Sequence, residues 1–341
     1  MKAAVLEQGR LHLREVPVPE PGPGEVLVRV EACGICHTDL HYLDHGVPTF
    51  KSPVILGHEV SGRIAQLGPG VSGPWREGHR VLLPAVFTCG ACRTCRSGRE
   101  NICEQMKMLG NHVDGAYAEY VVAPTKDCFT LPAEIPLAEA CLIGDAMSTP
   151  YHAVKHRAQV RLGETVAIFG CGGVGMNAVQ FAALAGGYVI AVDIDEGKLQ
   201  RSREFGARET LNPRAVERVD KELKKRTGGG VDVALEVIGK PETIRAAYDS
   251  LRPGGRLCVV GYSAEPVPLA ASKLMFYELA VVGSLGCRPS DYPELIELVR
   301  TGRAQLLPLV TGRYPLENIF AGFDALRRGE GLRGIVLPQA A

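Results

Sequence analysis

The chain has 341 residues, which is long for a single hydrophobic core, so we expect two domains. Hydrophobic residues make up 46% and charged residues 22%, the profile of a globular protein. Lys+Arg and Asp+Glu both total 38, so the net charge gives no reason to expect binding to nucleic acid or to an anionic membrane.

Membrane insertion and export are not indicated either. No apolar run approaches the ~18 residues of a membrane-spanning helix, and the N-terminal MKAAVLEQGRLHLREV lacks the apolar region of a signal peptide. The eleven cysteines form an odd and clustered set. In a chain without an export signal, such cysteines are typical of reduced thiols and metal ligands, which predicts a cytoplasmic protein.

The first part of the chain is rich in proline, glycine and short β-like segments. Alternating apolar residues predict half-buried strands within residues 16–34, 54–68, 79–87 and 116–124. From about residue 146 the pattern changes to strands and helices in alternation, which is typical of a parallel sheet covered by helices. The strands of this second part are expected at residues 165–170, 188–193, 231–239, 256–262 and 279–286. A helix and a β-like end at residues 313–338 belong to neither part by pattern alone.

A glycine-rich motif, GCGGVG, directly follows the first strand of the second part and opens an amphipathic helix. Its members are Gly170, Cys171, Gly172, Gly173, Val174 and Gly175. In this context the motif predicts a pyrophosphate site at the helix N-terminus. Asp193 ends the next strand, where a carboxylate can accept hydrogen bonds from the adenosine ribose and repel a 2′-phosphate, so NAD is expected rather than NADP. The alternative is an ordinary glycine-rich turn with a helix-capping aspartate.

Four cysteines in CGACRTCRSGRENIC have the spacing C-x2-C-x2-C-x7-C. They are Cys89, Cys92, Cys95 and Cys103. Four thiolates within fifteen residues can close around a zinc ion and leave no open position, which predicts a structural metal. An iron–sulfur cluster is the competing interpretation, because ferredoxins also use tight C-x2-C spacing. The long last gap and the lack of a second such set favour zinc.

The segment GICHTDLH, residues 34–41, contains ligand-type side chains but only part of a metal site. Cys36 needs partners, and the next candidate is His58, which follows an apolar strand together with Glu59. A catalytic zinc requires one further protein ligand and an open position.

In this order, GICHTDLH, GHE, the cysteine lobe, GCGGVG and an aspartate-ended strand resemble the zinc-dependent medium-chain alcohol dehydrogenases. The likeness covers essentially the whole chain, including EVIG and the C-terminal NIFAGFDALRRGE. It implies an α/β protein with a GroES-like β-rich catalytic domain, residues 1–146 and 286–341, around a Rossmann domain, residues 147–285. The active site is then expected in the cleft between them.

This sequence departs from the family pattern at the third ligand of the catalytic zinc. Most alcohol-active members have a second cysteine six residues before an aromatic residue, which here is Tyr151 in GDAMSTPYHA. Asp145 stands at that position, and some aldehyde-active members resemble this chain in using a carboxylate. We therefore expect Cys36, His58 and Asp145 as ligands. Cys141 is the alternative, but its apolar surroundings, LAEACLIG, favour a buried helical position.

The resemblance also implies roles for the neighbours of these ligands. Asp39 would hydrogen-bond the zinc-bound histidine, and Glu59 would lie behind the metal. Thr38 and His41 match the two protein members of a proton relay, and His37 matches a basic residue near the cofactor pyrophosphate. The simpler alternatives are that Asp39 caps the following helix, that Glu59 is a surface carboxylate and that His37 is a solvated histidine.

Further residues are assigned to the cofactor site. Thr149 and Val174 match positions that lie against the nicotinamide, although either could serve packing alone. Ile194 follows Asp193 and offers no positive charge to a 2′-phosphate, and Lys198 is placed in the same site. We leave His45, His112 and His152 as surface or otherwise satisfied histidines.

The expected activity is reversible hydride transfer between an alcohol and NAD, with one catalytic and one structural zinc per chain. A secondary or cyclic alcohol is favoured, and GDAMSTPYHA also resembles members that act on cyclic hydroxyacyl-CoA thioesters. A zinc-containing reductase of conjugated C=C bonds and a non-enzymatic, lens-like relative are the alternatives. We expect a homodimer or a homotetramer that binds a small alcohol or carbonyl compound.

Overall fold

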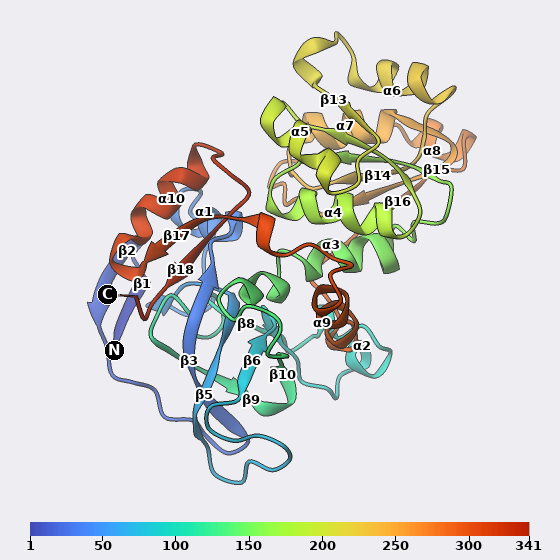
Figure 1. The fold of residues 1–341 in the computed structure, drawn as a ribbon. Coiled ribbons are helices and arrows are strands. Elements are labelled where there is room, and N and C mark those ends of the chain that lie inside the picture. Colours follow the sequence, from blue (N-terminus) through green and yellow to red (C-terminus); the bar gives the residue numbers. More distant parts are fainter. Residues whose placement is uncertain (341) are drawn as a thin grey trace. The chain divides into compact units, whose positions relative to one another are not determined.

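The computed structural model describes residues 1–340 (Figure 1). The chain divides into two compact units: Met1–Ser148 with the C-terminal segment that starts at Gly286, and Thr149–Leu285. It stays a prediction that residues 1–146 and 286–341 form the catalytic domain and that residues 147–285 bind the cofactor. Within residues 1–340, no helix is both long and apolar enough to cross a membrane.

The first unit is built on a seven-stranded sheet of order β10-β6-β5-β3-β18-β17, with β9 also paired to β3. The pairs are antiparallel except for β17 with β18. The strands are β3 (Glu25–Gly34), β5 (Glu59–Leu67), β6 (Arg80–Leu83), β9 (Tyr120–Pro124), β10 (Phe129–Thr130), β17 (Val310–Pro315) and β18 (Arg333–Leu337). Valines and other apolar residues alternate along β3 and bury one face in the core, as expected for a half-buried strand.

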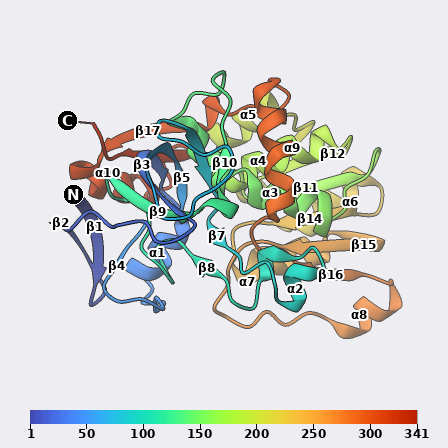
Figure 2. The same cartoon turned by 90° about the horizontal axis from the view of Figure 1, so that it is seen from below.

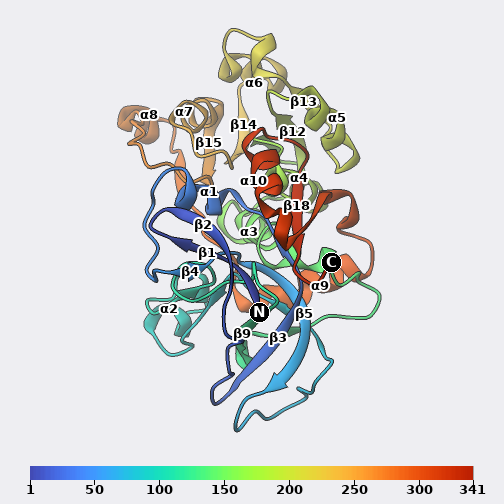
Figure 3. The ribbon, with the colours of Figure 1, turned by 90° about the vertical axis from the view of Figure 1, so that its left-hand side faces the viewer.

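The C-terminal segment completes this sheet, which answers where the helix and β-like end of residues 313–338 belong. Strand β18 pairs with β3, so that Ile335 lies opposite Gly34 and Val336 opposite Cys33. The red β18 and the blue β3 are therefore neighbours in space although about 300 residues separate them (Figure 1). Helix α10 (Ile319–Arg327) packs on β17 and β18 (Figure 3).

Smaller elements complete the first unit. They are the sheet of β1 (Lys2–Glu7), β2 (Arg10–Glu15) and β4 (Val54–Ile55), the pair β7 (Val86–Phe87) and β8 (Lys107–Met108), and the helices α1 (His37–Leu43), α2 (Arg93–Arg96) and α9 (Tyr292–Arg300). Helix α3 (Ser148–His152) lies at the boundary of the two units.

The second unit is a six-stranded, wholly parallel sheet of order β13-β12-β11-β14-β15-β16. Figure 2 shows β14, β15 and β16 side by side. The strands are β11 (Thr165–Phe169), β12 (Tyr188–Val192), β13 (Glu209–Leu211), β14 (Val231–Glu236), β15 (Leu251–Val259) and β16 (Ala280–Gly283). The helices are α4 (Gly173–Leu184), α5 (Glu196–Glu204), α6 (Val219–Thr227), α7 (Pro241–Asp249) and α8 (Ala271–Phe276). This alternation confirms the predicted parallel α/β unit.

One local prediction was wrong. A strand was expected at residues 256–262, but β15 runs from Leu251 to Val259. The start of β15 is irregular: its register against β14 shifts between Val231 and Val233, and Gly254 has φ +74°. Leu251 pairs with Val231 and Arg256 with Val233, so residues 252–255, which include Pro-Gly-Gly, stand opposite Asp232 alone and bulge out of the ladder.

Candidate active site

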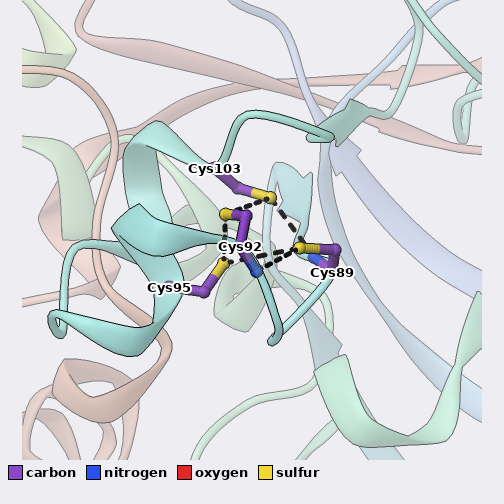
Figure 4. A group of neighbouring side chains, drawn as sticks. All are labelled: Cys89, Cys92, Cys95 and Cys103. Carbon is purple, nitrogen blue, oxygen red and sulfur yellow. Dashed lines mark hydrogen bonds between the residues drawn. The ribbon is translucent and has the colours of Figure 1, made fainter.

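The four cysteines of the lobe converge on one point (Figure 4). The Sγ atom of Cys92 lies 3.4 Å from that of Cys95 and 3.9 Å from that of Cys103, and the Sγ atoms of Cys89 and Cys95 are 3.9 Å apart. Zinc–sulfur bonds of about 2.3 Å in a tetrahedron place sulfurs roughly 3.8 Å apart. None of the four forms a disulfide. The arrangement fits a closed four-thiolate zinc site.

Hydrogen bonds in the lobe lower the pKa of Cys89 and Cys92, whereas burial raises the pKa of Cys95 to about 12. The backbone N–H of Cys92 donates to Cys89 Sγ at 3.2 Å, and that of Gln105 donates to Cys103 Sγ at 3.3 Å. A hydrogen bond with the Thr94 hydroxyl and one with the backbone lower the pKa of Cys92 to about 5. Metal ligation requires the thiolate form.

A second cluster unites Cys36, His58, Glu59 and Asp145, whose ligand atoms all lie within 4.8 Å of one another. Cys36 caps α1, His58 and Glu59 stand at the start of β5, and Asp145 follows the 3₁₀ helix Glu139–Gly144. Asp145 Oδ2 lies 4.0 Å from Cys36 Sγ and 3.7 Å from His58 Nε2. The alternative ligand, Cys141, is completely buried in the 3₁₀ helix and is not a member of the cluster.

The buried polar atoms of this cluster fit a cation. His58 Nε2 and both carboxylate oxygens of Glu59 are buried without a hydrogen-bond partner. A buried ring nitrogen or carboxylate without a hydrogen bond is costly, and a divalent ion would satisfy both kinds of group. One thiolate, one imidazole and one carboxylate match the ligand set of a zinc site with an open position.

Asp39 fixes which nitrogen of His58 faces the cluster. Its Oδ1 lies 3.6 Å from His58 Nδ1, on the side opposite to Asp145. Burial acts to lower the pKa of His58, but the nearby acidic groups of Asp145, Asp39 and Cys36 outweigh it and raise that pKa well above its usual value. Nδ1 thus has a carboxylate partner, and Nε2 is left for a metal.

Sequence reasoning missed Arg333, a buried arginine at the start of β18. Its guanidinium lies 3.4 Å from Glu59 Oε1 and donates to the Ile35 carbonyl at 2.9 Å. Burial raises the pKa of Glu59 well above its usual value, and the charge of Arg333 opposes that shift. The signal in the sequence was a lone cation at the entrance of an apolar strand, RGIVL.

The predicted relay residues share helix α1. Thr38 and His41 are three positions apart and so lie on one face of the helix. The Thr38 hydroxyl is 3.6 Å from Cys36 Sγ. His41 is partly buried 5.6 Å from the ring of His45, and burial together with the charge of His45 lowers its pKa. His37, by contrast, is exposed.

In the second unit, the glycine-rich loop connects β11 to α4. Gly170 has φ +100°, and a Cβ on Gly175 would lie 1.8 Å from the Gly170 carbonyl oxygen, so both positions require glycine. Nothing lies within 4 Å of a Cβ placed on Gly172, which leaves that backbone open to a ligand. The loop and the N-terminus of α4 therefore fit a dinucleotide pyrophosphate.

Asp193 follows β12 and closes this loop. Its Oδ2 accepts the N–H of Cys171 at 2.6 Å, and its Oδ1 accepts that of Asp195 at 2.9 Å. Ile194 beside it is exposed, and Lys198 is partly buried in α5. Thr149 and Val174 are partly buried, in α3 and at the start of α4.

Comparison with known proteins identifies the family. Residues 22–133 match the alcohol dehydrogenase GroES-like domain, and residues 173–301 match the zinc-binding dehydrogenases. An alcohol dehydrogenase of Geobacillus stearothermophilus is 36% identical over 334 residues, 97% of each chain. The protein therefore belongs to the zinc-dependent medium-chain alcohol dehydrogenase family, which confirms the resemblance and the GroES-like and Rossmann fold class.

Two further relatives narrow the class of reaction. A sorbitol dehydrogenase of Bacillus subtilis is 36% identical over 352 residues, covering 99% of this chain and 98% of the relative. A structure described as a zinc-binding dehydrogenase of Sinorhizobium meliloti, bound to NADP, has a TM-score of 0.90 at 32% identity and 99% coverage of both chains. The protein is thus an oxidoreductase of alcohols or polyols and their carbonyl products, and its relatives support zinc and a nicotinamide cofactor.

The pair of Arg333 and Glu59 gives a first prediction. Arg333→Met leaves the Glu59 carboxylate buried without its cation, so the free energy of unfolding should fall by about 3–5 kcal/mol. Urea denaturation of the zinc-loaded protein measures this. Arg313→Met is the matched control on the neighbouring strand β17: Arg313 pairs with Glu139 but its side chain is 50% exposed, so the loss should be about 0–1 kcal/mol. Equal losses would contradict the role of the buried pair.

Proposed function

We propose that this chain is an NAD-dependent zinc alcohol dehydrogenase with one catalytic and one structural zinc. The observation that carries the proposal is the convergence of Cys36, His58 and Asp145, with His58 Nε2 buried and lacking a hydrogen-bond partner. These three residues would hold the catalytic zinc, and the four cysteines of the lobe would hold the structural one. Zinc at the first site would supply a Lewis acid for the substrate oxygen.

The chain's own residues would do the remaining work. Asp39 holds the His58 ring with Nε2 toward the cluster. The Thr38 hydroxyl, beside Cys36, can take a proton from the substrate hydroxyl and give its own to an acceptor, and His41 on the same helical face is that acceptor. Glu59, paired with Arg333, would lie behind the zinc held by the other three residues. In alcohol oxidation, the proton of the substrate hydroxyl would therefore leave through Thr38 and His41 on α1, and the cofactor would take the hydride.

The cofactor would be NAD, held by the second unit. Backbone N–H groups of the loop from Gly170 to Gly175 and the N-terminus of α4 would bind the pyrophosphate, and Asp193 would accept hydrogen bonds from the ribose hydroxyls. Thr149 and Val174 would contact the nicotinamide ring, and Ile194 and Lys198 would border the adenosine end. The exposed, uncharged Ile194 supports NAD over NADP.

A secondary alcohol is the substrate class that we propose, because the sorbitol dehydrogenase relative acts on a polyol with secondary hydroxyls. NAD reduction with a panel of primary, secondary, cyclic, polyol and hydroxyacyl-CoA alcohols tests this choice. An allylic alcohol is added to the panel, and the matching enone is assayed by the oxidation of NADH. Faster turnover of enones than of any alcohol would favour a C=C reductase instead.

A homodimer or homotetramer is the assembly that we propose. Strand β16 is an edge strand, paired only with β15 among the described residues, and Ala280, Val281 and Gly283 on it are exposed. Phe276 nearby is 74% exposed. An open edge with apolar neighbours is readily covered by a second copy. Light scattering measures the mass, and a monomer at micromolar concentration would contradict the proposal.

The ligand set yields a second prediction. Mild chelation should remove one zinc per chain together with activity, because a three-ligand site exchanges metal more readily than four thiolates do. Asp145→Asn should weaken zinc retention at this site at least ~10-fold and lower activity with it. Cys141→Ala is the control, and its zinc content should equal that of the unaltered protein. The reverse result would make Cys141 the ligand.

The third prediction concerns the preference for NAD over NADP. Catalytic efficiency should favour NAD over NADP at least ~100-fold, since Asp193 repels a 2′-phosphate and the next residue, Ile194, offers no positive charge. Asp193→Ala should lower the efficiency with NAD and shrink the preference. Asp195→Ala removes a nearby carboxylate that only caps α5, so it should keep the preference. Comparable efficiencies with the two cofactors in the unaltered enzyme would refute the assignment of Asp193.

The fourth prediction concerns the proposed proton relay of Thr38 and His41. Thr38→Ala should lower the rate of alcohol oxidation by roughly 10²–10⁴-fold, and His41→Gln by about 10-fold, because water can partly replace the imidazole. Neutral His41 accepts the proton, so the rate should fall as the pH drops through the pKa of His41. Burial and His45 lower that pKa, which places the fall below the ordinary value of 6.5.

Two variants separate this relay from a general pH effect. His41→Gln should flatten the profile in that range, and imidazole buffer should restore part of the rate. His45→Gln is the matched control: it should keep the fall but move it to higher pH, because a charge that lowers the pKa of His41 is gone. An unaltered profile in His41→Gln would mean that the proton leaves by another route.

A further inference from the structure

Tyr117 is a completely buried tyrosine whose hydroxyl lies beside the candidate zinc site. The residue stands just before β9, and its hydroxyl oxygen is 2.7 Å from Asp39 Oδ2 and 2.9 Å from the Gly34 carbonyl oxygen. A phenol has one proton to donate. The carboxylate is the closer and the charged acceptor, so it is the stronger partner of the two.

The two oxygens of Asp39 have different surroundings. Oδ2 accepts the Cys36 N–H at 3.1 Å in addition to the Tyr117 hydroxyl. Oδ1 has no hydrogen-bond partner and faces His58 Nδ1 at 3.6 Å. Two donors therefore anchor one oxygen of the carboxylate, which orients the other toward the imidazole.

The ring of Tyr117 is itself held by the turn that carries His58. The backbone N–H of Tyr117 donates to the Leu56 carbonyl at 2.9 Å, and a Cβ on Gly57 would lie 2.9 Å from Tyr117 N and 3.0 Å from its Cδ1. On another side, the ring meets Phe323 edge-on at 5.9 Å between ring centroids. The hydroxyl thus has little freedom to leave Asp39.

We propose that Tyr117 is a positioning residue for the catalytic zinc: its hydroxyl fixes Asp39, and Asp39 in turn fixes the His58 ring with Nε2 toward Cys36 and Asp145. The inference rests on the proposed function, since it concerns zinc at that cluster. Removing the hydroxyl leaves Asp39 with a single anchor, so the imidazole is less well oriented. Zinc should then leave this site faster, while the four-cysteine site is unaffected.

The test measures zinc release from the two-zinc enzyme to a coloured chelator. Tyr117→Phe should release the labile zinc about 10-fold faster than the unaltered enzyme, the lower end of what loss of a ligand's hydrogen-bond partner costs. Tyr248→Phe is the matched control, because Tyr248 is equally buried but donates to the Ala270 carbonyl in the other unit. Its labile zinc should leave at the unaltered rate. The slow, four-cysteine zinc should be unchanged in both variants.

A double variant shows whether Tyr117 acts through Asp39. In the background of Asp39→Ala, which should itself speed release, Tyr117→Phe should add nothing. Equal release rates for Tyr117→Phe and the unaltered enzyme would overturn the proposal. So would faster loss of both zinc ions, because that would show a general structural role. If the unaltered enzyme holds no labile zinc that supports activity, the proposed function itself fails, which is a different result.

Discussion

The candidate site depends on the register between β3 and β5. Gly34 lies opposite Glu59 in this antiparallel pair, so the residues that follow β3 meet the residues that begin β5. A Cβ on Gly34 would lie 1.9 Å from Glu59 Oε2, and only glycine allows the carboxylate to lie there. A slip of one residue would turn Glu59 to the opposite face of the sheet and separate the cluster.

Charge is the second constraint on this arrangement. In the metal-binding form, with His58 neutral and the acids ionised, Cys36, Asp39, Glu59 and Asp145 would bring four negative charges into a largely buried space, and Arg333 would bring one positive charge. A divalent cation reduces the excess from three negative charges to one. Burial raises the pKa of Glu59 because this carboxylate has little solvent and only one guanidinium to stabilise its charge. The chain thus contains a site whose acidic groups favour a bound cation.

The sequence could predict contacts between residues that are close along the chain, but not contacts between distant segments. The cysteine lobe and the glycine-rich loop were predicted with their members, because each lies within fifteen consecutive residues, and the family and the fold class are confirmed. The roles of the site residues stay predictions, although the structure brings Cys36, His58, Glu59 and Asp145 together. The contacts of Arg333 with Glu59 and of Tyr117 with Asp39 could not be predicted. They join segments 274 and 78 residues apart, and only the register of the assembled sheet decides which side chains meet.

The two clusters therefore depend on the fold in different ways. Cys89 lies in the loop before α2, Cys92 and Cys95 stand at the start of α2 and within it, and Cys103 directly follows the 3₁₀ turn. Hydrogen bonds within the lobe already orient these thiols. The other cluster needs the end of β3, the start of β5 and the 3₁₀ helix before Asp145 at once, with β18 supplying Arg333 behind them. Metal at the lobe would stabilise one loop, whereas metal at the second cluster would stabilise the pairing of distant strands. Loss of the metal from the second cluster should therefore lower the stability of the paired strands as well as the activity.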